Sequence, residues 1–208
     1  MTVRKRVIRQ VMGQFHRPHG LGGRLAGWVM GHRSSNRQRN LWVVSLLGVK
    51  PTDRVLEIGF GPGIAIRELS RVATGGQIYG TDHSEVMVGI ATKRNAGAVR
   101  SGQVHLQCGS VENLPKLDEP LDKILAVNSM GLWSDPPQRL KELRAMLRPG
   151  GQIAIASQPR CPGATSETSV RAAQEIEAVL TEAGFAQTRV QTMPLDPPVV
   201  CVIAVNNP

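Results

Sequence analysis

Cysteines, long apolar runs and aromatic residues are scarce in this chain of 208 residues. The three cysteines, Cys108, Cys161 and Cys201, form no C-x-x-C pair and no even set, which argues against a disulfide framework or a zinc site. No apolar run approaches the roughly 18–20 residues of a membrane span, and the basic N-terminus lacks the apolar core of a signal peptide. We therefore expect a cytoplasmic globular protein with reduced thiols and no metal.

Acidic residues are absent from residues 1–52, which contain ten Lys or Arg side chains and therefore carry a charge of +10. Residues 53–208 contain fifteen basic and sixteen acidic side chains, which gives −1 and a net charge of +9 for the whole chain. This asymmetry predicts two parts. Residues 1–52 form a basic N-terminal helical extension, and residues 53–208 form a nearly neutral domain.

The basic extension has several possible roles. It could close over an anionic substrate, rest on acidic lipid head groups as a peripheral membrane contact, contact nucleic-acid phosphates, or form a plain solvated surface. Only Phe15, Trp28 and Trp42 are available there for base stacking, so nucleic acid is not favoured as a partner. We expect a short amphipathic helix over 1–13 and a stronger helix over 34–47.

A glycine-rich turn follows the first apolar run of the nearly neutral domain. Residues 55–58 predict a strand, residues 64–72 a helix, and Gly59, Gly61 and Gly63 lie between them. In such a turn backbone N–H groups and a helix N-terminus face a ligand. The spacing is not G-x-G-x-x-G, because Ile64 stands at the third glycine position, which disfavours a dinucleotide. Glu57 would repel a pyrophosphate and suits a ligand with an ammonium group; a tight turn without a ligand is the alternative.

The segment from Val55 to Gly63 resembles motif I of the class I S-adenosylmethionine-dependent methyltransferases. The order of elements over residues 53–208 is similar to that family, and so is the turn Leu147–Gly151 (Leu-Arg-Pro-Gly-Gly) before a strand. The resemblance implies S-adenosylmethionine as the cofactor, seven strands with the last antiparallel, and an N-terminal lid. It places the helix over 34–47, with Asn36 and Asn40 on one face, across the mouth of the cofactor site; two merely solvated asparagines are the alternative.

A second carboxylate ends the next predicted strand, over 76–82. Asp82 follows Gly63 by nineteen residues, an interval at which an acidic residue can accept hydrogen bonds from both hydroxyls of a ribose. A turn or N-cap aspartate is the alternative. His83 follows directly and is included in the predicted cofactor site, Ser84 can cap the next helix, and the resemblance places Met87 near the adenosine.

The ends of the third and fourth predicted strands, over 104–112 and 121–129, complete the predicted cofactor site. The resemblance places the adenine contacts at Ser110, where the family commonly has Asp, and at the backbone N–H of Val111. Asn128 ends the fourth strand, so we expect it in the cleft at the carboxyl edge of the sheet. The Asp135-Pro136-Pro137 segment is rejected as an amino-methylating signature; Asp135 is expected to be the N-cap of a helix whose first residue is Pro136.

Further along, the pattern predicts a helix over 136–147, a strand over 152–156, a helix over about 170–180 and two closing strands near 190 and over 199–205. The alternation of strands and helices predicts an α/β, three-layer domain with a mostly parallel sheet, and the resemblance implies that this sheet is Rossmann-like with seven strands.

We therefore expect a methyltransferase acting on a small-molecule or lipid-like acceptor. The alternatives are an RNA methyltransferase that uses the basic arm, an NAD(P)-dependent oxidoreductase, and a non-catalytic basic binding module. Candidate general bases are His16, His19, His32 and His83, but each is more readily structural or exposed, so no catalytic residue is assigned. The acceptor atom and the oligomeric state stay open.

Overall fold

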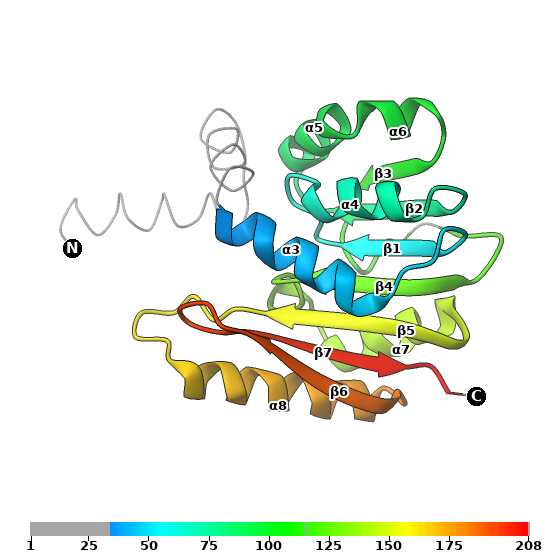
Figure 1. The fold of residues 1–208 in the computed structure, drawn as a ribbon. Helices are drawn as coiled ribbons and strands as arrows, with labels where there is room; N and C mark the ends of the chain where they lie inside the picture. The colour runs from blue at the N-terminus through cyan, green and yellow to red at the C-terminus, as the bar shows by residue number, and fades with distance from the viewer. Residues whose placement is uncertain (1–33, 115, 208) are drawn as a thin grey trace.

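The computed structural model describes residues 34–114 and 116–207, which form one sheet covered by helices on both faces (Figure 1). The strands are β1 (Arg54–Ile58), β2 (Gln77–Asp82), β3 (Val104–Cys108), β4 (Leu121–Val127), β5 (Leu147–Ser157), β6 (Ala186–Met193) and β7 (Val199–Val205). The expected three-layer α/β fold is confirmed.

The order of the strands in the sheet is β3-β2-β1-β4-β5-β7-β6. β7 runs antiparallel to both of its neighbours, and the other paired strands are parallel, as expected. From β1 the chain proceeds to β2 and β3 on one side and then returns to β4 on the other side. The topology therefore switches direction at β1, and in open α/β sheets ligands bind at the carboxyl ends of the strands at such a point.

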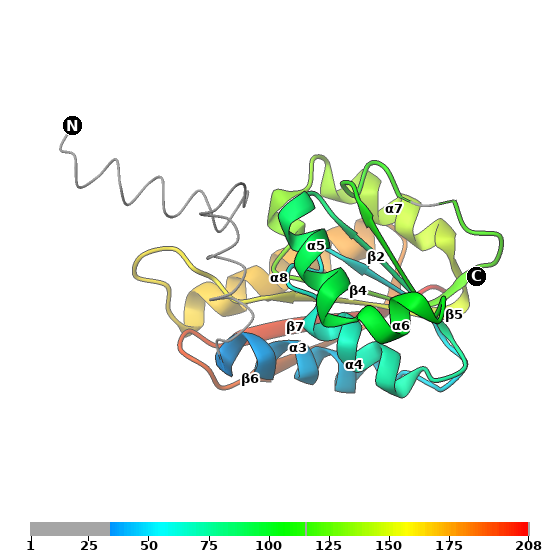
Figure 2. The same cartoon turned by 90° about the horizontal axis from the view of Figure 1, so that it is seen from above.

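The helices divide between the two faces of the sheet (Figure 2). One face carries α3 (Ser34–Leu47), α4 (Ile64–Val72), α5 (Glu85–Arg94) and α6 (Ala96–Arg100); the other carries α7 (Pro136–Met146) and α8 (Ser166–Glu182). A short 3₁₀ helix, η1 (Met130–Leu132), follows β4.

Each face of the sheet has its own hydrophobic core, because successive strand side chains point to opposite faces. In β1, Val55 packs into the core under α3 and α4, whereas Leu56 packs into the core under α7 and α8. Both side chains are completely buried. Burial on both faces explains why the parallel strands have continuous apolar runs.

The helix expected over 34–47 is confirmed as α3, and its C-terminal half belongs to the core. Val43, Val44 and Leu47 are buried at 0–3% exposure, and α3 contacts α4, β4, β5 and β7. Leu41 and Trp42, which precede these residues in the helix, are only half-buried. The N-terminal half of α3 reaches the carboxyl edge of the sheet, where a lid was expected (Figure 1).

Two expected helix caps are confirmed. The Ser84 hydroxyl accepts from the N–H of Met87 at 3.4 Å at the start of α5, and the Asp135 carboxylate accepts from the N–H of Gln138 at 3.3 Å at the start of α7. Side-chain acceptors at these positions satisfy N–H groups that the helix itself leaves unpaired.

Strand boundaries differ from the expectation: β3 and β4 end earlier, at Cys108 and Val127, and the largest difference is at the start of β5. β5 begins at Leu147, which pairs with Leu121 of β4, and regular pairing resumes at Gln152 with Lys123 after an irregularity. Gly150, with φ of 76°, lies within this irregularity. The turn after α7 is thus part of the strand, because the chain enters the sheet as soon as the helix ends.

The predictions made for residues 1–33, including the helix over 1–13 and the bases His16, His19 and His32, lie outside the described residues. In the described ranges no helix is long and apolar enough to cross a membrane.

Candidate active site

The glycine turn between β1 and α4 uses its three glycines in two ways. All three have positive φ: 74° at Gly59, 51° at Gly61 and 73° at Gly63. A Cβ at Gly59 would lie 2.4 Å from the Cβ of Ser129, and one at Gly63 would lie 2.7 Å from the Cβ of Ala91. A Cβ at Gly61 meets no atom within 4 Å. Gly59 and Gly63 therefore allow close packing within the protein, and Gly61 faces open space.

Glu57 lies beneath this turn and is 1% exposed. Its carboxylate accepts a hydrogen bond from the N–H of Ile66 in the first turn of α4, whose N-cap residue, Gly63, has no side chain to do so. Oε2 of Glu57 is buried and has no hydrogen-bond partner within the described ranges. Burial, and secondarily the neighbouring Asp82, raise the pKa of Glu57 from 4.5 to about 8.

Asp82, at the end of β2, is held by two backbone donors. Oδ2 accepts from the N–H of Gly61 at 2.8 Å, and Oδ1 accepts from the N–H of Ser84 at 2.9 Å. Burial raises the pKa of Asp82, while these two N–H groups and His83 oppose the rise. Each oxygen keeps a further lone pair that can accept from a ligand hydroxyl.

The turn thus brings two carboxylates to the carboxyl edge of the sheet. An orphaned buried carboxylate oxygen suits a cationic donor such as an ammonium group, and the oriented oxygens of Asp82 suit the paired hydroxyls of a sugar. A pyrophosphate, in contrast, would bring a further acidic group beside these two carboxyl groups, neither of which can neutralise it. Among the described residues no group of three or more His, Cys, Asp or Glu side chains could hold a metal ion.

Comparison with known proteins identifies the family. The family described as "Methyltransferase domain" matches residues 55–151. A Bacillus subtilis protein named uncharacterized methyltransferase YdaC is 32% identical over 181 residues, which cover 86% of this chain and 97% of that protein. The chain belongs to the class I S-adenosylmethionine-dependent methyltransferases.

Two further proteins are similar to this methyltransferase. A demethylmenaquinone methyltransferase of Symbiobacterium thermophilum is 29% identical over 113 residues, which cover 53% of this chain and 45% of that protein, so the match spans about half of each. The crystal structure of a SAM-dependent methyltransferase from Aquifex aeolicus has a TM-score of 0.65 at 24% identity, covering 80% of this chain and 88% of that chain.

Because the chain belongs to this family, its cofactor is S-adenosylmethionine. The residues fit this molecule, because its methionine part ends in an ammonium group and its ribose has two free hydroxyls. The oxidoreductase and the non-catalytic binding module, which were alternatives at the level of sequence, do not agree with this membership.

The other residues of the predicted site on β2 and α5 adjoin the turn. The imidazole of His83 is 38% exposed, and its Nδ1 lies 3.8 Å from Oδ1 of Asp82. Met87 is buried at 2% exposure in the first turn of α5. Its side chain is therefore covered by other parts of the protein, and an adenosine could contact it only at the small area that stays accessible.

Ser110 and Val111 follow β3 at the same edge of the sheet. Hydrogen bonds from the hydroxyls of Ser110 and Ser134 lower the pKa of Glu112 to about 2. The Ser110 hydroxyl is able to accept a hydrogen bond from a ligand, as an adenine amino group would require. Val111 is buried at 4% exposure and belongs to the core under α7.

Asn128 directly follows β4 and lies in the left-handed region, with φ of 57°. Its Oδ1 accepts from the N–H of Gln158 at 2.7 Å, which fixes the orientation of the amide. Its Nδ2 is buried and has no hydrogen-bond partner in the part of the chain that the structure describes. Asn128 therefore presents an oriented donor at the carboxyl edge.

Two residues near Asn128 were missed by the sequence analysis, Arg39 of α3 and Gln158 after β5. Nη1 of Arg39 donates to Oε1 of Gln158 at 2.5 Å, across 119 residues of sequence. Asn36 and Asn40 are also joined, since Nδ2 of Asn40 donates to the carbonyl of Asn36 at 2.7 Å. In the sequence, only the four-residue spacing of Asn36 and Asn40 indicated that polar side chains of this helix share a face.

Proposed function

We propose that this methyltransferase transfers a methyl group from S-adenosylmethionine to a small-molecule or lipid-like acceptor. The observation that carries the assignment of the cofactor site is the pair of carboxylates flanking the glycine turn. Glu57 would receive the ammonium group through its orphaned Oε2, and Asp82 would accept from the ribose hydroxyls. Both roles fit the chemistry of the donor groups.

The remaining predicted residues would surround the rest of the cofactor. Gly61 provides the open space, and Gly59 and Gly63 keep the turn close to its neighbours. Around the nucleoside and the methionine part we place the other predicted residues: His83, Met87, Ser110, Val111 and Asn128. The bound cofactor supplies a methyl group already activated on a sulfonium. On transfer to the acceptor, the electron pair of the S–CH₃ bond would stay on sulfur, which becomes a neutral thioether.

The protein's own contribution is to bind, orient and exclude water, because the methyl group needs an acceptor held in line with it. The neutral state of Glu57 before binding, with a pKa of about 8, avoids two adjacent buried charges until a cationic group arrives. The acceptor itself enters at the carboxyl edge of the sheet, as ligands of open parallel sheets do.

Two arguments favour a small-molecule or lipid-like acceptor. The Symbiobacterium thermophilum relative is named a demethylmenaquinone methyltransferase, and its name indicates a small, lipid-like acceptor. The chain also has only 3% aromatic residues, few for stacking on RNA bases. We keep residues 1–52 as a proposed basic extension and lid, and 53–208 as the cofactor-binding domain. RNA methylation and a peripheral membrane contact through 1–52 stay as outcomes to be tested.

Titration calorimetry with S-adenosylhomocysteine and with NADH tests the cofactor site. We expect the wild type to bind S-adenosylhomocysteine and not NADH. Asp82→Asn and Glu57→Gln should each weaken binding about tenfold or more, since each removes a charge-assisted contact. Asp118→Asn, a matched change at an exposed carboxylate, should bind as the wild type does. Unchanged affinity in both site variants would refute the assignment.

A second experiment identifies the acceptor class. A cell extract is incubated with the protein and S-adenosylmethionine carrying a labelled methyl group, and is then fractionated into small molecules, lipids and RNA. We expect the label among small molecules or lipids, and less of it with Asp82→Asn. Label confined to RNA would replace the proposed acceptor with the alternative.

A further inference from the structure

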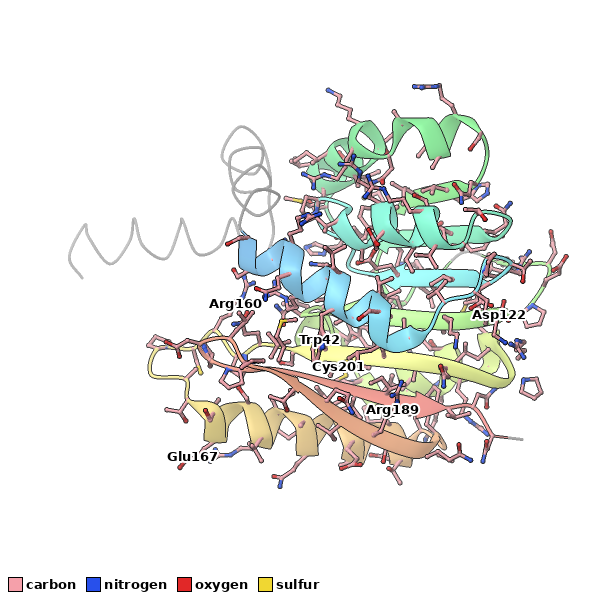
Figure 3. All side chains as sticks on the ribbon, in the orientation of Figure 1. Trp42, Asp122, Arg160, Glu167, Arg189 and Cys201 are labelled. Atoms are coloured by element: carbon pink, nitrogen blue, oxygen red, sulfur yellow. The ribbon has the colours of Figure 1, made fainter. Side chains whose placement is uncertain are left out.

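The two helix-covered faces of the sheet differ in charge. The helices α3, α4, α5 and α6 together contain seven Lys or Arg residues and two acidic residues, which gives a charge of +5. The helices α7 and α8 contain four basic and five acidic residues, which gives −1. Glu167, one of these acids, lies on α8 and away from α4, α5 and α6 (Figure 3). The positive charge of the described helices is therefore concentrated on one face.

Six of these seven cations reach the surface, whereas Arg39 is buried. Five of the six are exposed and Arg94 is half-buried. They form the basic face, which consists of Arg37, Arg67, Arg71, Lys93, Arg94 and Arg100. Within the described ranges only Arg71 of this set has a carboxylate in ion-pair contact, that of Glu68 at 3.8 Å. The acids of the described domain therefore leave most of this positive charge uncompensated.

Arg67 and Arg94 are held beside each other although both are cations. The carbonyl of Gly63, the N-cap residue of α4, accepts from the N–H of Arg67 at 3.3 Å and from Nδ2 of Asn95 at 3.2 Å. Arg94 is the last residue of α5 and directly precedes Asn95. Burial, and secondarily the charge of Arg67, lower the pKa of Arg94. An anion placed between the two guanidinium groups would relieve their repulsion.

The basic face borders the edge of the sheet at which the acceptor would enter. Arg37 and Arg67 are each the fourth residue of their helices, and α3 and α4 pack against each other. α4 begins just after the carboxyl end of β1, and the N-terminal half of α3 reaches the same edge (Figure 1). An anionic surface that meets the basic face would therefore lie next to the carboxyl edge.

Two classes of large partner present rows of phosphate groups, acidic membranes and nucleic acids. Binding of single-stranded nucleic acid usually uses aromatic side chains on which bases stack. The helices α4, α5 and α6 contain no aromatic residue, and Trp42 of α3 is half-buried against the core. Acidic head groups attract a cluster of roughly four to eight Lys or Arg residues without any stacking. The composition of the basic face therefore favours a membrane.

We propose that the basic face binds the surface of an acidic membrane. Guanidinium groups bind phosphate oxygens through paired N–H donors, and each Lys or Arg near an acidic surface adds to the attraction. Contact through this face would hold the carboxyl edge of the sheet next to the lipid, where a lipid-like acceptor is found. The inference rests on the proposed function for the acceptor, but not for the membrane contact itself.

Co-sedimentation of the full chain with lipid vesicles, in the absence of any cofactor, tests the contact. Vesicles of phosphatidylcholine alone are compared with vesicles of phosphatidylcholine and phosphatidylglycerol in equal parts, at about 0.1 M and about 1 M salt. We expect binding to the acidic vesicles at the lower salt concentration and loss of binding at the higher one, because salt screens exposed charges. Equal binding to both kinds of vesicle, or binding to neither, would overturn the inference.

Two double variants of the full chain assign the binding to the basic face. Arg67→Gln with Arg94→Gln removes the adjacent pair of cations, and Lys93→Gln with Arg100→Gln removes two exposed ones. Each should weaken binding to the acidic vesicles about ten- to thirtyfold, as the loss of two charges near an acidic surface implies. Residues 1–33 contain seven Lys or Arg and are unchanged in both variants. Wild-type affinity in both would assign the contact to residues 1–33 and refute the role of the basic face.

A matched control removes two charges from the other face. Lys141→Gln with Arg171→Gln changes two exposed cations of α7 and α8 and should bind the acidic vesicles as the wild type does. An equal loss in this control would show that net charge alone matters and would refute a specific face. Melting temperatures identify any variant that does not fold, and the other double variant then decides.

The outcomes separate this inference from its rival and from the function on which it rests. The same proteins are titrated with a fluorescently labelled single-stranded RNA. RNA binding that the basic-face variants weaken, without binding of the wild type to acidic vesicles, would assign the face to nucleic acid. All variants should keep wild-type affinity for S-adenosylhomocysteine, because none changes a residue of the proposed cofactor site. A wild type that fails to bind S-adenosylhomocysteine counts against the cofactor site, whereas the vesicle experiment alone decides the membrane contact.

Discussion

Glu57 combines nearly complete burial with one hydrogen bond to α4 and an oxygen that meets no partner among the described residues. Burial keeps its pKa at about 8, so the side chain is mostly neutral at pH 7 before a ligand binds. Burying an unpaired carboxylate would cost far more free energy than burying the neutral carboxylic acid. The same side chain becomes a strong acceptor once a cationic group lies beside it.

The stability of the unliganded protein should depend on pH through Glu57. An acid whose pKa is raised by folding contributes stability that is complete below its unfolded pKa and is lost as the pH rises through the folded pKa. The free energy of unfolding should therefore fall between a pH of about 4.5 and about 8. Urea denaturation of the wild type and of Glu57→Gln across this range measures the effect. The free energy of unfolding of Glu57→Gln should not show this fall between the two pH values. Parallel plots of the free energy of unfolding against pH for the two proteins would contradict the assignment.

At the scale of elements, the turn between β1 and α4 must both pack closely against α5 and leave space for a ligand. Gly63 brings α4 close to α5, where its missing Cβ leaves room for Ala91 and Asn95. Gly61 has the same sign of φ and open space around it, and its N–H orients Asp82. The strand–turn–helix unit therefore depends on Gly63 for packing and on Gly61 for access to the ligand.

Alanine substitutions should separate these two roles. Gly63→Ala forces a Cβ against Ala91 and should lower the free energy of unfolding by about 1–3 kcal/mol. Gly61→Ala strains only its own backbone, at about 1 kcal/mol, and should chiefly weaken binding of S-adenosylhomocysteine. Urea denaturation and calorimetry on both variants check this. Equal effects of the two substitutions on binding and on stability would contradict the distinction.

On the scale of the whole molecule, the sheet places every proposed ligand contact at one edge. β1, β2, β3, β4 and β5 are parallel, so the chain leaves each of them on the same side. The N-terminal half of α3 and the segment between β6 and β7 reach that side as well (Figure 1). A ligand bound there contacts many segments at once and should stabilise the domain as a unit.

Binding of S-adenosylhomocysteine should therefore raise the melting temperature. At a concentration about 100 times the dissociation constant the stabilisation is about 2.7 kcal/mol, which corresponds to roughly 5–10 °C for a chain of this size. Differential scanning fluorimetry over a range of ligand concentrations measures the shift. NADH at the same concentrations should produce none, and Asp82→Asn should need more S-adenosylhomocysteine for the same shift.

The sequence by itself determined the local units of this protein. The run from Val55 to Gly63 and the helix after it predicted β1, the turn and α4, because strand periodicity, glycine and helix pattern are all local signals. The caps at Ser84 and Asp135 were predicted for the same reason, since a cap bonds to a residue three positions on. The seven strands and the antiparallel β7 came from the family resemblance.

Only the tertiary structure decided which side chains meet. Periodicity places a residue on a face of a helix, but it does not say what that face contacts. Arg39 belonged to a basic segment in sequence, yet it is buried against Gln158, 119 residues away. The burial of Glu57 and the fixed amide of Asn128 were likewise decided by packing, because long-range contacts depend on the order of strands in the sheet.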